Sequence, residues 1–142
     1  MRNILIFLIL TLTSGFTFFG DNYKKLHDNN GFIMIPTRDI KNEKATFYSY
    51  DYKGKNIKFF LLKTNDGKIR AAFDACDVCY PARKGYSQTN YFMICNNCGQ
   101  KFHITRIGEF RGGCNPSPLK FHIEKDYVKI SVSELASHYN YF

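Results

Sequence analysis

The sequence predicts a small all-β domain, and three observations support this fold class. Apolar and aromatic residues occur in short runs, the runs alternate with turn-forming residues, and helix signals are confined to the chain ends. Short strands at close spacing are typical of a β-sandwich or barrel. The length of 142 residues allows one domain, and the apolar fraction of 44% excludes a generally disordered chain.

The first expected strands lie before residue 65. Residues 32–35 (FIMI) form an apolar run that ends at Pro36, and residues 45–52 interleave aromatic with polar side chains. Residues 57–64 are again apolar and aromatic, and the turn residues 53–55 (KGK) separate them from the preceding run. Each run is bounded by turn or breaker residues, as expected of strands.

The strongest turn of the chain is Asn65-Asp66-Gly67. Glycine tolerates positive φ there, and Asp and Asn side chains bond the turn backbone. The turn predicts a hairpin whose second strand covers residues 68–73, and a second hairpin is expected around residues 124–126. The other predicted strands are 91–94, 121–123 and 127–132.

A short helix is expected to close the chain, over about residues 132–138. Ser131 with Glu134 three residues later fits a capping box, in which side chains satisfy free N–H groups of the first helical turn. This would be the only helix inside the domain.

The N-terminal residues 1–20 have the composition of an export signal. Arg2 precedes an apolar run over residues 4–12, and small residues follow at 13–15, as in a secretory signal peptide. An uncleaved hydrophobic membrane anchor is an alternative, because the apolar character extends from residue 4 to Phe19. The length of this stretch is just short of the ~17–25 residues that span a bilayer. A buried core helix is the third interpretation.

Both export interpretations place the protein at the outer face of the cytoplasmic membrane, in the periplasm. Residues 21–30 are polar and predict a linker, and residues 31–142 form the expected domain. Exposed thiol pairs tend to oxidise in such a compartment. Cysteines kept there in pairs are therefore expected to be disulfides or metal ligands.

The net charge of +8, from 20 Lys and Arg against 12 Asp and Glu, does not indicate a nucleic-acid site. The basic residues are scattered near predicted turns and form no helical stripe, so a solvated surface is the simpler interpretation. We expect no nucleic-acid partner. A basic domain still favours an anionic membrane surface or an acidic redox partner.

Four of the five cysteines form two close pairs, with the pattern C-x2-C-x15-C-x2-C. Two residues between cysteines allow a tight turn to direct both sulfurs at one point, so two such knuckles can build an all-sulfur cage. Zn(II) and iron–sulfur clusters both take thiolate ligands of this kind. The predicted ligands are Cys76, Cys79, Cys95 and Cys98.

Two alternatives to a metal site remain open from the spacing alone. The pairs could form two disulfides, which an exported domain would tolerate. A redox-active pair of thioredoxin type is less well supported, because that chemistry occurs at a helix start within a βαβ pattern. For a metal site, we expect Cys98→Ser to remove the metal and Cys114→Ser to leave most of it.

The fifth cysteine, Cys114, lies between two glycines and two prolines in the segment RGGCNPSPL. One interpretation is that Cys114 is a thiol near the metal site, where it could exchange with another ligand. The other is that it packs in the loop as a small apolar residue. His103, five residues after Cys98, is expected to be a neighbour of the site and not a ligand. Asn96, Asn97 and Gly99 flank the ligands Cys95 and Cys98 and are expected to surround the metal site.

The stretch from residue 72 to 119 resembles the membrane iron–sulfur FtrD-like family. The shared text is FDAC-x-VCY, KGY, CNNCG, RI-x-E and GGCNP-x-PL, and the resemblance covers about residues 33–134. It implies a metal centre, either an iron–sulfur cluster or a related site, that passes electrons beside a bacterial iron-uptake system. Membrane-associated redox or iron-permease components are the implied partners. Many relatives carry several transmembrane helices, whereas this chain has one candidate segment.

The fold also resembles, more distantly, that of Rieske ferredoxin domains. Gly108-Glu109, Gly112-Gly113 and Pro118-Leu119 follow the second pair in the order of a Rieske tail. Rieske loops use one Cys and one His each, but Cys79 and Cys98 stand where His would be. Two thiolates in place of two imidazoles add negative charge, so an all-cysteine cluster is expected at a lower reduction potential.

These observations lead to three functional hypotheses. The first is an extracytoplasmic iron–sulfur electron carrier of an iron-uptake system, the second a zinc-binding or metal-handling domain, and the third a disulfide-stabilised binding module. No nucleophile, base and orienting residue form a legible set, so we expect an electron carrier or metal-binding protein without catalytic residues.

Overall fold

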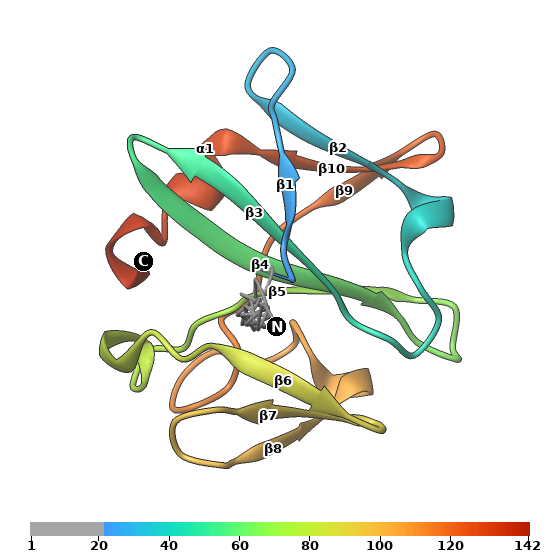
Figure 1. Ribbon diagram of the computed structural model, residues 1–142. Coiled ribbons are helices and arrows are strands. Elements are labelled where there is room, and N and C mark those ends of the chain that lie inside the picture. Colours follow the sequence, from blue (N-terminus) through green and yellow to red (C-terminus); the bar gives the residue numbers. More distant parts are fainter. Residues whose placement is uncertain (1–21) are drawn as a thin grey trace, which may run out of the picture.

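The central strand β4 (Lys55–Lys63) determines the layered architecture of the molecule. A computed structural model describes residues 22–142. β4 contains the consecutive apolar residues Phe59 to Leu62, all of which are buried. Because neighbouring side chains of a strand point to opposite faces, this run places apolar groups on both sides of the sheet. Both faces are therefore covered by other sheets (Figure 1).

Three open sheets make up the described part of the chain. The four-stranded sheet has the order β1-β3-β4-β5, with β1 (Lys24–Leu26), β3 (Thr46–Tyr52) and β5 (Ile69–Phe73). A three-stranded sheet has the order β2-β10-β9, with β2 (Phe32–Pro36), β10 (Tyr127–Ser131) and β9 (His122–Glu124). The third has the order β6-β7-β8, with β6 (Tyr86–Thr89), β7 (Phe92–Cys95) and β8 (Lys101–His103). Only the β1–β3 pair is parallel among these strands.

Helical segments are short. The α-helix α1 covers Val132–Ala136, and four 3₁₀ turns cover Thr37–Asp39 (η1), Tyr80–Ala82 (η2), Ile104–Arg106 (η3) and Tyr139–Tyr141 (η4). As the sequence predicts, the Ser131 side chain accepts a hydrogen bond from the Glu134 N–H (3.1 Å). The Glu134 carboxylate does not close the capping box but accepts from the Lys120 N–H (3.1 Å). None of the helices described for residues 22–142 has the length and apolarity needed to cross a membrane.

Two apolar cores lie on the two faces of the central sheet. The first packs Ile57, Phe59 and Leu61 of β4 against β2 and β10. The second packs Phe60 and Leu62 of the same strand against the β6–β8 layer and the cysteine loops. The cysteine-bearing layer thus rests on the central sheet through its own core, on the side away from β2 and β10 (Figure 1).

The all-β prediction is confirmed, and because the sheets are not closed the architecture is a sandwich and not a barrel. Every predicted strand is present, and the predicted turn at Gly67 has φ +78°. Three short strands were not predicted: β1, inside the expected linker 21–30, and β6 and β8, which flank β7. The expected N-terminal helix lies outside the described residues, and the Rieske likeness stays a prediction.

Candidate metal centre

The first cysteine pair lies in the loop that leaves β5. The Cys79 N–H donates to Cys76 Sγ (3.1 Å), and the Tyr80 N–H donates to the Cys76 carbonyl (3.3 Å). These bonds close a knuckle, after which η2 continues the chain. Cys76 is buried and Cys79 half-buried, so the two residues between them allow both sulfurs to lie on one side of the loop.

The second pair begins at the end of β7. The Gly99 N–H donates to the Cys95 carbonyl (2.8 Å), and Gly99 has φ +75°, a conformation that glycine adopts without steric cost. Asn96 holds this turn to the first half of the layer, because its side chain donates to the Lys84 carbonyl (3.0 Å) and accepts from Ser87 (2.8 Å). Cys95 is buried, whereas Cys98 is exposed.

The five sulfurs come together in two overlapping groups. Within each group the sulfur atoms lie within 4.8 Å of one another. The groups are Cys76, Cys79 and Cys95, and Cys79, Cys98 and Cys114. The structure thus brings all four sequence-predicted ligands to one place, adds Cys114, and puts Cys79 in both groups.

Histidine does not take part in this cluster. His103 is exposed on β8, where its Nδ1 lies 2.8 Å from Thr105 Oγ1. Among residues 22–142, the groups of metal-ligating side chains contain cysteine only. An all-thiol donor set fits an iron–sulfur cluster or another thiophilic metal and does not fit a Rieske centre.

The protonation of the thiols is uneven. Hydrogen bonds from Asn97, and next from Cys114, lower the pKa of Cys79 to about 7. Burial raises the pKa of Cys95 to about 11. A hydrogen bond with Cys98 is the main cause that raises the pKa of Cys114. Cys79, the thiol shared by both groups, therefore becomes the thiolate that a metal binds more readily than Cys95 or Cys114 does.

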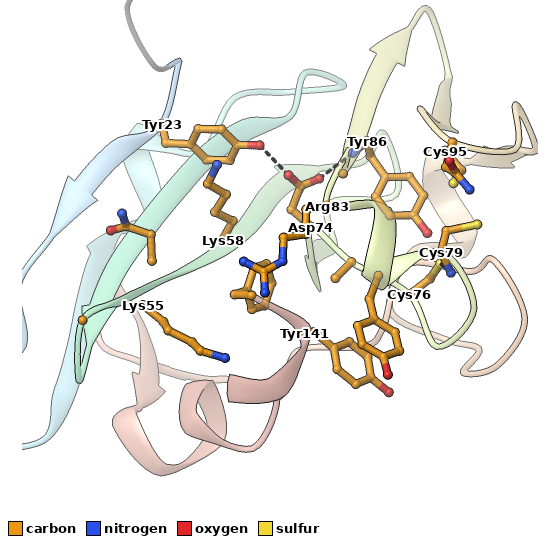
Figure 2. A pocket seen from close by; sticks show the side chains of 17 residues that line it. Tyr23, Lys55, Lys58, Asp74, Cys76, Cys79, Arg83, Tyr86, Cys95 and Tyr141 are labelled. Atoms are coloured by element: carbon orange, nitrogen blue, oxygen red, sulfur yellow. Dashed lines mark hydrogen bonds between the residues drawn. The ribbon is translucent and has the colours of Figure 1, made fainter.

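A cavity of about 300 Å³ opens beside the cluster (Figure 2). Cys76, Cys79 and Cys95 form one end of it, and Tyr23 and Lys58 lie at the opposite end, with Asp74 between (Figure 2). Cys98 and Cys114 are not part of its lining. The inner thiols thus face this cavity, and the other two lie on the outer side of the centre.

Asp74 connects the cysteine-bearing segments, a role that the sequence analysis missed. It is 4% exposed, and its carboxylate accepts from the Tyr23 hydroxyl and from the Tyr86 N–H (2.7 Å) (Figure 2). Tyr86 pairs with Cys95 across β6 and β7, and its hydroxyl donates to the Cys114 carbonyl (2.6 Å). Asp74 and Tyr86 belong to the motifs FDAC and KGY, which carry the family resemblance. The motifs therefore marked both residues, but the sequence did not show what contacts they make.

Replacing Asp74 by Asn is expected to change the pH dependence of stability. Burial raises the pKa of Asp74 from 3.8 to about 6, in spite of its two hydrogen bonds. The folded protein therefore binds this proton more tightly than the unfolded chain, and the contribution of Asp74 to stability falls by about 3 kcal/mol as the pH rises from about 4 to about 7. Asp74→Asn should remove this fall, which denaturant unfolding across that pH range measures.

The comparison for this prediction is the wild-type protein in the same metal state. Carboxylates with a lowered pKa, such as Asp77 and Glu109, contribute stability that is lost toward acid. Their contribution is common to both proteins and cancels in the difference. If the free energy of unfolding depended on pH in the same way in the wild type and in Asp74→Asn, the burial of Asp74 would not control its ionisation.

Comparison with known proteins supplies the family. A search of curated proteins finds no significant match. The sequence profile described as "Membrane iron-sulfur containing protein FtrD-like" matches residues 40–142, which include both cysteine pairs, Cys114 and Asp74. The match covers more than half of the chain and agrees with a site built from thiols alone. The chain therefore belongs to the FtrD-like family of membrane iron–sulfur containing proteins.

Proposed function

We propose that the protein is an electron carrier at the outer face of the cytoplasmic membrane, with an iron–sulfur cluster held by two cysteine pairs. The ligands in this proposal are Cys76, Cys79, Cys95 and Cys98. Such a cluster exchanges single electrons when it is bound. The protein contributes the thiolate ligands, fixes their positions and partly excludes water from the site.

The division of the sulfurs into two overlapping groups carries this proposal. A single tetrahedral zinc ion, with metal–sulfur distances of about 2.3 Å, needs four sulfurs about 3.8 Å apart from one another. Among residues 22–142, no group within 4.8 Å contains all four of the paired cysteines. A cluster with more than one metal position accommodates this wider spacing, because ligands of different irons lie farther apart than ligands of the same iron.

The exposure of the centre also supports a carrier function. Cys98 is exposed, and Val78, between the first two ligands, is 60% exposed. Cys76 and Cys95 are buried in the core against the central sheet. The buried cysteines fix the position of the centre. The exposed outer side allows a docking partner to approach closely enough for electron transfer.

The role in iron uptake rests on the family. We propose membrane-associated redox or iron-permease components as partners, and an N-terminal export signal or anchor as the means of placing the domain beside them. The net charge of +8 favours an acidic partner surface. The zinc-binding domain and the disulfide-stabilised module are the alternatives that the experiment below must separate.

The test is the metal and spectral content of the full chain, purified anaerobically in mild detergent. We expect iron, acid-labile sulfide, visible charge-transfer absorption that bleaches with dithionite, and an electron paramagnetic resonance signal from the reduced protein. His103→Ala is the matched control, since His103 follows Cys98 by five residues in the sequence but lies outside the thiol groups. It should retain the metal and the spectrum.

Each other outcome points to a different function. A colourless protein with one zinc per chain contradicts electron transfer and supports the metal-handling alternative. A metal-free protein without reactive thiols supports the disulfide-stabilised module. A cluster that is present but cannot be reduced and reoxidised contradicts the carrier function while leaving the ligand assignment in place.

A further inference from the structure

We infer that Cys114 is a fifth ligating thiol of the centre, interchangeable with Cys98 at its outer side. The inference deepens the proposed function and rests on it where the iron–sulfur cluster is concerned. It assigns five thiols to four ligand positions, with Cys79 as the sulfur common to the inner and the outer group.

The sulfurs of Cys114 and Cys79 lie at a distance that suits a shared metal. Cys114 Sγ lies 3.5 Å from Cys79 Sγ. Two thiolates on one tetrahedral metal, at metal–sulfur distances of about 2.3 Å, lie about 3.8 Å apart. The pair is therefore already at nearly the separation that a shared metal requires. Cys98 completes the outer group within 4.8 Å of both.

The loop of Cys114 is also bound to the segment of the first knuckle at several points. The Phe73 N–H donates to the Ser117 carbonyl (2.8 Å), and the Ser117 N–H donates to the Ala75 carbonyl (3.0 Å). The Arg111 guanidinium lies 3.6 Å from the Asp77 carboxylate. Bonds on both sides of Cys114 hold the loop, so the approach of its sulfur to Cys79 follows from the backbone contacts of the fold.

The backbone of Cys114 is itself bound to a residue of the second half of the site. Its carbonyl accepts from the Tyr86 hydroxyl (2.6 Å), and Tyr86 stands opposite Cys95 in the β6–β7 pair. Cys114 is thereby anchored to the strand pair that carries the second knuckle. A loop cysteine that only fills space needs no such anchor to the strand that carries a ligand.

The two groups differ in exposure, which explains why exchange belongs to the outer one. The inner thiols Cys76 and Cys95 are buried, and both line the cavity. Cys98 is exposed and Cys114 half-buried. An exposed thiolate can leave the metal and be solvated at low cost, whereas a buried thiolate without its metal would carry an uncompensated charge.

The exchange balances without an oxidant or reductant. With a metal bound, Cys114 would take the ligand position that Cys98 gives up, so the number and charge of the thiolate ligands would not change. The Cys114 thiol gives its proton to the departing Cys98 thiolate, directly or through water. The two sulfurs lie within 4.8 Å of one another, which is close enough for this transfer.

The test uses Cys98→Ser, Cys114→Ser and the double variant in the full chain, purified anaerobically. Each single variant should keep most of its iron and sulfide, and Cys98→Ser should shift the electron paramagnetic resonance signal through the changed ligand position. The double variant should lose metal affinity by more than about 100-fold, beyond the 10–100-fold that loss of a supporting contact typically produces. This result differs from the expectation drawn from spacing alone, in which Cys98→Ser empties the site.

Loss of the cluster in Cys98→Ser to the same extent as in the double variant would overturn the inference. If the wild-type chain holds no cluster, the proposed function fails first, and Co(II) titration of the reduced proteins tests the inference by itself. Thiolate-to-cobalt charge-transfer intensity should be similar in the wild type and both single variants and fall in the double variant. Equal loss in Cys98→Ser and the double variant would again overturn it.

Discussion

Cys79→Ser is expected to abolish metal binding more completely than any other single substitution of a thiol. Cys79 belongs to both sulfur groups, so its loss leaves two sulfurs on the inner side and two on the outer side. It is also the thiol whose pKa is lowered, to about 7, by hydrogen bonds from Asn97 and Cys114. We expect metal affinity to fall by more than about 100-fold, beyond the 10–100-fold typical of residues that only support ligands.

The measurement is iron, sulfide and visible absorption per chain, compared with Cys114→Ser. Cys114 cannot replace Cys79 in the inner group, because it belongs to the outer group alone. Cys114→Ser should therefore keep its metal while Cys79→Ser loses it. A Cys79→Ser protein that retains a cluster would mean that Cys79 is not the shared ligand.

Gly85→Val is expected to be the most destabilising single substitution near the centre. A Cβ at Gly85 would overlap the Asp74 carboxylate, with Asp74 Cγ only 2.7 Å away, and Gly85 has φ +60°. The left-handed backbone costs a β-branched residue about 1–2 kcal/mol. Displacing the buried carboxylate also breaks its bond with the Tyr86 N–H, which costs about 1–3 kcal/mol more.

Chemical denaturation measures this loss, and Gly67→Val is the matched control. Gly67 has φ +78°, but no atom lies within 4 Å of the position that a Cβ would take there, so this variant isolates the backbone cost. Gly85→Val should exceed Gly67→Val by about 2 kcal/mol. Equal losses would show that the Asp74 side chain can move away freely and does not brace the cysteine loops.

Local signals explain which elements were predictable. The Asn65-Asp66-Gly67 turn and the Ser131 cap depend on residues three or four apart, and both are present. The strands β6 and β8 were missed because β6 (YSQT) is mostly polar and β8 has only three residues. Their strand conformation comes from pairing with the apolar β7, which no local propensity records.

The same distinction applies to the site. The two knuckles follow from the two-residue spacing of each pair, since a tight turn is enough to direct both sulfurs to one side. No spacing pattern marked Asp74 in the sequence, because a single carboxylate after a strand is common in proteins and indicates no particular role. Its importance became visible only when burial placed it between Tyr23 and Tyr86, which are 51 and 12 residues away along the chain.

By itself, the sequence determined the fold class, the hairpins, the family resemblance and the four paired thiols, because each depends on spacing between near neighbours. The tertiary structure alone decided that Cys114 joins them and that Cys79 stands between two groups. Cys114 is 35 residues from Cys79 along the chain. Its position is set by backbone hydrogen bonds between residues 73–75 and Ser117, which form only when the loop packs beside the first knuckle.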